Sequence, residues 1–420
     1  MISRLHRALA LREGETAPVL LSCLLFWLLM SGYYILRPIR DEMGIAGGQD
    51  LLHTLFLVTL AVTALAAPAV GWLVRRFQRE VFLPVALRFF ALNLVIFYLA
   101  LRFADERTLV WSGRVFYVWL SVFNLSALSL FWSFMADGFG YERGRRLFGI
   151  VAVAGTVGAI FGSGLTTLLV SAVGRPNLLL VAILLVEGAA RGVGPLSRRF
   201  ETMGGTAVPQ PDTGILAGVT RTLRSPYLLG IAGFIFLYTL MNTFLYFEKT
   251  RIVAESVSGS DARAAVLGSI DLWANLLTLV VQLLLTGRLL RGVGAGPLLL
   301  LMPLGFAAAF LALGLWPSLT LFIVLQTVLR AANYALAKPA RETLFTVVPQ
   351  EDRYKAKNFI DTFVYRGGDA VGSLASGAVA VIAWLALPIA AVWAVLALRL
   401  GRQQRRLAAK DAPVPDRPLS

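Results

Sequence analysis

The stretch that decides the fold is APVLLSCLLFWLLMSGYYILRPIRDEMG, residues 17–44. Residues 17–36 carry no formal charge, and at 1.5 Å rise per residue this length matches a hydrocarbon core about 30 Å thick. Arg37 and Arg40 then follow within two helical turns. Pro38 lacks an N–H and restricts the residue before it, so it predicts a break or kink in the helix. A charged, kinked helix end of this kind indicates a binding site.

The composition sets the class of protein. Of the 420 residues, 57% are hydrophobic and only 15% are charged, and the mean hydropathy is +0.73. A soluble domain could not bury this much apolar material, so the chain is predicted to be an all-α polytopic membrane protein. The N-terminal basic segment is followed by too long an apolar run for a signal peptide, and we expect it to be a retained anchor.

Hydropathy and turn residues predict about twelve transmembrane helices. We place them near residues 17–36, 51–74, 81–101, 109–135, 147–173, 177–194, 227–247, 264–287, 296–315, 317–337, 359–383 and 384–400. Counted in alternate connections, 27 Lys and Arg residues fall on one side and 8 on the other. By the positive-inside rule this predicts a multi-pass membrane protein with both termini in the cytoplasm.

The longest connection predicts two halves. Its prolines, glycines and arginines are typical of a cytoplasmic linker. We therefore expect an N-terminal six-helix bundle at 1–194, a linker at 195–226, a C-terminal six-helix bundle at 227–400, and a basic, proline-containing cytoplasmic tail at 401–420. Glycines in the fifth and eleventh spans predict faces on which helices approach closely.

Ionisable residues inside spans are the candidates for function. A charge at the centre of a span costs about 2.5 to 3.5 kcal/mol, so it needs a partner or a water-filled cavity. Asp271 and Asn275 are four residues apart and share a helix face. Arg366 and Asp369 are three apart, and two interpretations stay open for them: a self-neutralising ion pair or a coupling site.

The expected lining of a central cavity is net basic. Guanidinium groups bind carboxylate or phosphate with two hydrogen bonds, which predicts an anionic substrate. The candidate substrate-binding residues are Tyr33, Arg37, Arg40, Arg88, Arg114, Asp271, Asn275, Arg330 and Asn333. The candidate gate or coupling residues are Asp137, Arg146, Lys338, Lys357, Asp361, Arg366 and Asp369.

Signals of soluble enzymes are absent from the sequence. It holds no G-x-x-x-x-G-K-[ST], so phosphate binding by a P-loop is not expected. With two histidines and one cysteine, neither a zinc site nor a Cys/His nucleophile is expected. We predict no metal, no cofactor, no nucleic-acid partner and no enzymatic activity.

Three segments carry a resemblance to a known family. They are SGYYILRPIRDE (31–42), FWSFMADGFGYERGRRLFG (131–149) and KPARETLFTVVPQEDRYKAKNFIDTFVYRGGDAVGS (338–373). Together they resemble the nucleotide translocases of plastids and intracellular bacteria, the ATP/ADP exchange carriers, a distant branch of the major facilitator superfamily. The resemblance implies a free-living bacterial homologue of that family, located in the inner membrane.

The resemblance implies two six-helix bundles, alternating access and nucleotide exchange without hydrolysis. By position, Arg37 and Arg40 match the basic residues that end the family's first span, and Lys355, Lys357 and Asp361 match the opening of its eleventh. We therefore expect a secondary transporter or exchanger of an organic anion such as a nucleotide, monomeric and surrounded by membrane lipids. Two alternatives stay open: a proton-coupled transporter of an amphipathic solute or lipid, and a non-transporting receptor or scaffold.

Overall fold

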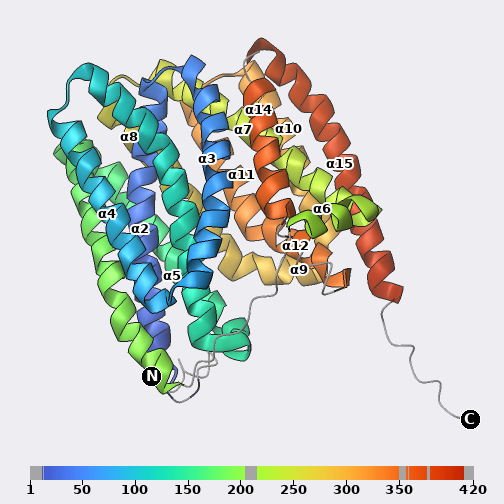
Figure 1. The fold of residues 1–420 in the computed structure, drawn as a ribbon. Helices are drawn as coiled ribbons and strands as arrows, with labels where there is room; N and C mark the ends of the chain where they lie inside the picture. The colour runs from blue at the N-terminus through green and yellow to red at the C-terminus, as the bar shows by residue number, and fades with distance from the viewer. Residues whose placement is uncertain are drawn as a thin grey trace, which may run out of the picture. The chain divides into compact units, whose positions relative to one another are not determined.

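The computed structural model describes residues 12, 14–203, 215–349, 356–357, 359–375 and 379–410 (Figure 1). Over these residues the regular secondary structure is entirely helical. The middle of the predicted linker (204–214), most of the predicted basic turn (350–355) and the end of the predicted tail (411–420) lie outside the described residues.

The chain divides into two compact units. Unit 1 comprises Met1–Gln210 and Val253–Leu276, and unit 2 comprises Pro211–Ile252 and Leu277–Ser420. A segment from the second half of the sequence thus packs with the first half. The predicted bundles 1–194 and 227–400, with linker and tail, remain a prediction about which segments move together.

Unit 1 is built from four long elements. They are α2 (Thr16–Ala46), α3 (Gln49–Arg76), α4 (Arg79–Phe103) and α5 (Glu106–Thr202). α5 is interrupted at Gly140 (φ 67°, ψ 178°) and at Gly174 (φ 80°, ψ 156°), in the left-handed region that favours glycine. The element therefore consists of three successive helices, and α2 and α4 pack against it (Figure 1).

Glycines allow α2 to contact α5 backbone to backbone. A Cβ at Gly158 would lie 2.5 Å from the carbonyl oxygen of Trp27, and the hydroxyl of Ser31 donates to the carbonyl oxygen of Gly158 across 3.2 Å. Such close approach gives van der Waals contact and hydrogen bonding that lipid cannot supply. The predicted close glycine face of the fifth span is present.

The predicted break at Pro38 is wrong, because α2 continues as a helix to Ala46. Proline's fixed φ is compatible with a helix, and its cost of about 3 kcal/mol comes from one lost hydrogen bond and a clash with the preceding turn. The flanking residues Ile35, Leu36 and Ile39 are fully buried. Packing of these side chains offsets the cost and keeps the charged end of α2 helical.

Unit 2 contains shorter elements. They are α6 (Ile215–Arg224), α7 (Pro226–Ser256), the end of α8 (Ser260–Val281), α9 (Gly287–Gly292), α10 (Ala295–Leu315), α11 (Leu319–Ala332), α12 (Lys338–Leu344), the 3₁₀ turn Phe345–Val347, α14 (Tyr365–Ala375) and α15 (Val379–Lys410). The buried indole of Trp393 on α15 packs against Phe234 and Phe306, with ring centroids 5.3 Å and 5.8 Å apart. These contacts form the centre of the unit.

Three π-helical turns interrupt the helices of unit 2, at Gln282–Thr286, Asn333–Ala337 and Ile360–Val364. A π turn widens the helix and leaves a carbonyl without its usual partner, and such turns occur frequently at functional sites. Here the Thr286 hydroxyl of one π turn donates to the carbonyl oxygen of Ala335 in another π turn across 2.7 Å, so that this carbonyl has a hydrogen-bond donor.

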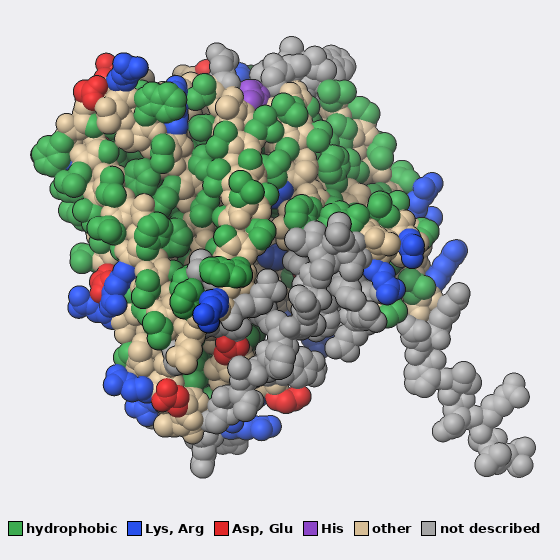
Figure 2. Space-filling model, viewed as in Figure 1, with side chains coloured by type: hydrophobic (Ala, Val, Ile, Leu, Met, Phe, Trp, Pro, Cys, Tyr) green, Lys and Arg blue, Asp and Glu red, His purple; other side chains and the backbone are tan. Residues whose placement is uncertain are grey.

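Ten helices of the described residues are long and apolar enough to cross a membrane. One of them, Arg146–Thr202, has 57 residues and is divided at Gly174, so it provides two crossings. The predicted span 359–383 is described only in part. On the face shown in Figure 2, hydrophobic side chains cover the middle of the helices and charged ones gather towards their ends. The all-α polytopic membrane fold is confirmed.

Candidate functional site

In unit 1, α2 brings its charged end against two other elements. We call this the α2 cluster, and its members are Arg37, Arg40, Asp41, Glu42, Arg175, Asp261 and Asp271. Arg37 Nη1 lies 3.1 Å from Asp271 Oδ1, and its guanidinium lies 5.7 Å from the centre of the Tyr34 ring. Asp271 is buried. A predicted binding residue of the first span thus pairs with a predicted one of the eighth.

Arg175 joins two carboxylates in the same cluster. It follows Gly174, whose positive φ starts the third helix of α5. Its guanidinium contacts the carboxylate of Glu42, and its Nε lies 3.0 Å from Asp261 Oδ1. Glu42 is fully buried, so the pairing offsets a desolvation cost of several kcal/mol.

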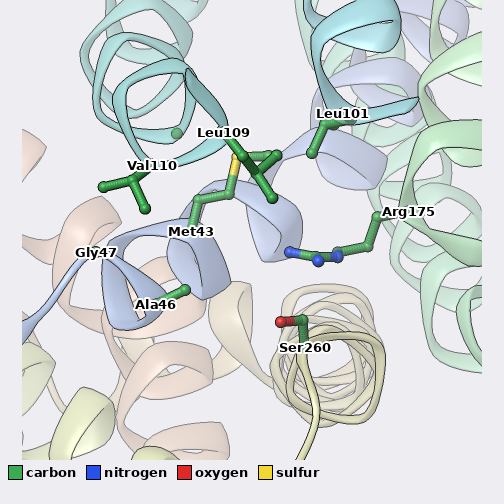
Figure 3. A pocket seen from close by; sticks show the side chains of 9 residues that line it. Met43, Ala46, Gly47, Leu101, Leu109, Val110, Arg175 and Ser260 are labelled. Atoms are coloured by element: carbon green, nitrogen blue, oxygen red, sulfur yellow. The ribbon is translucent and has the colours of Figure 1, made fainter. Parts of the chain in front are cut away.

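A cavity of about 90 Å³ opens beside Arg175 (Figure 3). The Arg175 side chain reaches into it, and Met43, Gly113 and Ser260 are among the residues that line it. This volume holds a few water molecules and is well below the roughly 300 Å³ of the smallest drug-sized pockets. The cavity beside the α2 cluster is therefore too small for a nucleotide.

Four predicted residues of unit 1 have partners within that unit. Arg40 lies 2.6 Å from Asp41 and places its guanidinium 4.9 Å from the centre of the Tyr117 ring. Arg88 is half exposed and pairs at 3.3 Å with Glu187. Arg114 stacks on Trp111 at 4.7 Å. Tyr33 packs edge-on against Tyr34, with centroids 5.3 Å apart.

Unit 2 contains a second group, which we call the basic–tyrosine cluster. Its members are Tyr238, Thr243, Arg330, Tyr334, Arg341, Tyr365, Arg366 and Asp369. Arg330, Arg341 and Asp369 all lie within electrostatic range of the Tyr238 hydroxyl, and Arg366 lies within range of Tyr365. Tyr238 and Tyr365 have ring centroids 6.4 Å apart. The cluster therefore combines three guanidinium groups and three tyrosines with the half-buried carboxylate of Asp369.

Contacts of the acidic residues in this cluster are long. Arg366 Nη1 lies 3.6 Å from Asp369 Oδ2, and Arg341 Nη2 lies 3.9 Å from Asp361 Oδ1. Thr243 donates to Asp369 Oδ1 across 3.1 Å. Charge-assisted hydrogen bonds between nitrogen and oxygen are typically about 2.7 to 2.9 Å. These arginines are close to carboxylates without being fully engaged by them.

The predicted amides lie near π turns or on a shared face. Asn275 is buried one turn after Asp271 on α8, and its Nδ2 has no hydrogen-bond acceptor among the described residues. Asn333 begins the π turn that also holds Tyr334. Gln282 reaches the carbonyl oxygen of Tyr334 at 3.4 Å.

The predicted gate residues have partners within their own units. Arg146 binds Glu15 with nitrogen–oxygen distances of 2.6 Å and 2.8 Å, and its hydrogen bonds hold the pKa of Glu15 below its usual value. Lys357 contacts Glu342, and Lys338 lies 6.0 Å from the centre of the Tyr334 ring. Asp137 is half-buried on α5. A latch formed by Asp137 and Arg146 with Lys338 and Lys357 stays a prediction.

Sequence reasoning missed several members of both clusters. Glu42, Arg175 and Asp261 lie at helix ends, where charged residues are expected in any membrane protein. Tyr238 and Thr243 on α7 look like ordinary interface or packing residues. The available signal was spacing, because Tyr238 and Thr243 are separated by about one and a half turns in a span that otherwise contains few polar groups.

Comparisons with known proteins place the fold. No family model matches the sequence, and no curated protein matches it. A bacterial homologue of the iron transporter ferroportin, in an inward-facing state, is similar in structure with a TM-score of 0.64 and 13% identity, over 92% of this chain and 98% of that one.

Two further solved structures are similar over nearly their whole length. An auto-inhibited peptide transporter of the POT family has a TM-score of 0.61 and 15% identity, over 96% of this chain and 99% of that one. The E. coli fucose:proton symporter has a TM-score of 0.56 and 15% identity, over 94% and 99%. The likeness at these identities shows that the chain has the fold of major facilitator transporters.

Proposed function

We propose that this chain is a secondary transporter that carries an organic anion across the bacterial inner membrane by alternating access. The observation that carries the proposal is the basic–tyrosine cluster inside a helical membrane unit. Both termini would be cytoplasmic, as the distribution of Lys and Arg predicts, and the protein would work as a monomer among lipids.

Three arginines in one membrane unit favour an anionic cargo. Each intramembrane charge raises the energy of insertion by a few kcal/mol, so such groups need a functional reason. Arg330 is buried, and Arg366 lies 3.6 Å from its carboxylate. Guanidinium groups in this environment bind carboxylate or phosphate strongly, because the low dielectric strengthens the interaction.

Tyrosine rings favour a cargo with a planar apolar part. Tyr334 is 41% exposed, more than Tyr238 or Tyr365, and it lies in a π turn. Stacking on such a ring is tolerant of base identity and is worth about 1 to 3 kcal/mol per base. Anionic groups beside stacking rings suit a nucleotide, which agrees with the resemblance to ATP/ADP translocases and makes exchange of nucleotides the first substrate class to test.

Alternating access would require the α2 cluster to open. The pair between Arg37 and Asp271 holds the first part of α8 to α2, although α8 comes from the second half of the sequence. If the halves 1–194 and 227–400 rock as bodies, this pair and the contact between Arg175 and Asp261 break once in each cycle. Ion pairs suit such a contact, because water can replace them when the contact opens.

Ligand-dependent thermal stabilisation tests the proposal. The purified protein in detergent is heated with ATP, ADP, dicarboxylates, sugar phosphates and lysolipids, as wild type, as Arg330→Ala and as Arg291→Ala. Arg291 is an exposed arginine of the same unit and serves as the matched control. A ligand that binds the folded state raises the melting temperature by mass action.

We expect a nucleotide to raise the melting temperature of wild type and Arg291→Ala, and to have little effect on Arg330→Ala. Equal shifts in all three proteins contradict an anion site at the cluster. Shifts with lysolipids alone favour the second candidate, a proton-coupled transporter of an amphipathic solute. The half-buried carboxylate of Asp369 is the observation that keeps this candidate open, and a fucose:proton symporter has a similar fold.

A further inference from the structure

Asp369 is an acidic group in the interior of unit 2 that anion binding alone does not explain. Its side chain is 17% exposed, and it lies on α14 in the middle of a predicted span. A carboxylate beside an anion site weakens anion binding through repulsion. Its presence therefore needs a role that offsets this cost.

Packing fixes the backbone that carries Asp369. Gly368 and Gly372 flank it, and a Cβ at Gly372 would lie 2.8 Å from Thr243 Cβ. A Cβ at Gly368 would lie 2.8 Å from the carbonyl oxygen of Phe236. α14 thus lies directly on α7, so Asp369 cannot leave by a shift of its helix. The interactions of Asp369 therefore change only when its carboxylate is protonated or when a side chain rotates.

The groups that face Asp369 are known on both helices. Thr243 and Tyr238 face it from α7, and Tyr365 and Arg366 face it from α14. Arg341 and Arg330 act on the same tyrosine, Tyr238. Arg366 is the cation nearest to Asp369, and its separation of 3.6 Å leaves it able to turn to another partner.

We propose that Asp369 is a proton-binding site coupled to the anion site, with Arg366 exchanged between Asp369 and the transported anion. Without cargo at alkaline pH, Arg366 neutralises the Asp369 carboxylate, and as the pH falls a proton can bind that carboxylate instead. When the anion pairs with Arg366, a proton from water binds an oxygen of Asp369 and makes a neutral acid, so that Asp369 is protonated up to a higher pH. The proton compensates the one negative charge of the cargo that pairs with Arg366.

Charge balance gives the physical reason. An uncompensated charge in a low-dielectric interior costs several kcal/mol, so binding of the anion and of the proton favour each other. The inference rests on the proposed function and adds to it that anion and proton travel together. Thr243 contributes in both states, because its hydroxyl can hydrogen-bond a carboxylate or a neutral acid.

The first test needs no cargo. Infrared spectra of the purified protein are compared between about pH 5 and pH 8, above the ordinary pKa of an aspartate near 3.9. We expect a carboxyl C=O band that changes with pH in wild type and in Asp105→Asn, an exposed control acid, and that is lost in Asp369→Asn. An unchanged spectrum in Asp369→Asn overturns the proton site.

The second test measures coupling with ADP as the probe. In wild type we expect the apparent affinity, from thermal shifts, to weaken up to about tenfold per pH unit above neutrality, the limit for one linked proton. Asp369→Asn should bind ADP with little pH dependence, and Arg366→Ala should bind weakly throughout. The titration of the phosphate itself, near pH 6, is common to all variants.

The two arms separate two failures. If ADP stabilises no variant at any pH, the nucleotide proposal fails while the infrared comparison still decides whether Asp369 binds a proton. If ADP binds wild type and Asp369→Asn with the same pH dependence, the coupling proposal is overturned and anion transport stands. Asn is close to Asp in shape and can accept the hydrogen bond from Thr243, and Thr243→Val provides a second variant that should shift the pH at which the carboxyl band changes.

Discussion

The two charged clusters of the molecule differ in how tightly their charges are paired. In the α2 cluster, Arg37 and Arg175 have carboxylate contacts at 3.1 Å or less. In the basic–tyrosine cluster, Arg366 and Arg341 lie 3.6 Å and 3.9 Å from their carboxylates. Tight pairing suits a contact that is either closed or open. Loose pairing suits a site whose cations must accept a ligand.

Helix geometry differs in the same direction. Within the described residues, the π turns all lie in unit 2, whereas the helices of unit 1 are interrupted by glycines at their ends. A π turn places side chains at angles that a regular helix cannot reach. Among the described residues, unit 2 thus combines the π turns with the loosely paired arginines, whereas unit 1 holds the tightly paired cluster.

The largest expected effect comes from breaking the tight cluster at Arg175. Arg175→Ala leaves the fully buried carboxylate of Glu42 without its guanidinium, and removal of one member of a buried pair costs about 3 to 5 kcal/mol. Arg341→Ala in the loose cluster should cost about 1 kcal/mol or less. Thermal unfolding of both variants measures the difference. Equal losses would contradict the distinction between the clusters.

A companion variant sharpens this result. Glu42→Gln removes the buried charge, so Glu42→Gln with Arg175→Ala should recover much of the stability that Arg175→Ala loses. A double variant that is no more stable than Arg175→Ala would show that the loss comes from packing of the arginine side chain.

A smaller effect is expected when the α2 cluster is weakened without leaving a buried charge. Asp271→Asn removes the ion pair to Arg37 while keeping the shape of the side chain. We expect the cluster to open more often, so a cysteine at Met43, which is buried and lines the cavity, should react several-fold faster with a membrane-impermeant maleimide. Cys23 is the single native cysteine, and Cys23→Ser provides the background.

The matched control for labelling is Asp105→Asn, which removes an exposed acid of the same unit. Its labelling rate at Met43→Cys should equal that of the background protein. If Asp271→Asn also labels at the background rate, the pair between Arg37 and Asp271 does not hold the cluster closed.

The hydrogen bond that joins two π turns of unit 2 can be tested by substitution. Thr286→Val removes the hydroxyl that donates to the carbonyl oxygen of the fully buried Ala335. An unsatisfied buried carbonyl costs about 1 kcal/mol or somewhat more. We expect a loss of this size in thermal stability, while Thr156→Val on unit 1, whose hydroxyl bonds only within its own helix at an exposed position, should be nearly neutral.

Much of the fold could be predicted from the sequence, because residues 17–36 and the other apolar segments match the thickness of a bilayer. The pairing of Arg366 with Asp369 followed from their spacing of three residues on a helix. The continuation of α2 through Pro38 could not be predicted, since it depends on burial of Ile35, Leu36 and Ile39 by distant segments. Local rules describe an isolated helix, whereas tertiary packing decides whether the helix continues past the proline.

The candidate site was less predictable for a related reason. Arg37 and Asp271 are 234 positions apart, and nothing in the sequence links them. Arg88 and Arg40 were expected to line a cavity. The carboxylate partner of Arg88 is Glu187, which is 99 positions away, and that of Arg40 is the adjacent Asp41. Charge type and depth can be estimated from one sequence, whereas partners depend on which helices pack together.

The smallest expected effect concerns Glu15, outside the membrane, where a tight pair lies apart from both clusters. Its hydrogen bonds to Arg146 lower its pKa in the folded protein below the value of 4.5 that it has when unfolded. A lowered folded pKa means that the unfolded chain takes up the proton first, so the pair stabilises the fold above pH 4.5 and this stabilisation is lost as the pH falls through the lowered value. Glu15→Gln should therefore be less stable than wild type by about 1 kcal/mol at neutral pH, and the gap should close in acid. Thermal unfolding of both proteins from pH 7 down to about pH 3 measures this. A gap that stays constant with pH would show that Glu15 acts through its shape and its bond to the Arg12 backbone, and that tight pairing alone does not make a contact sensitive to charge.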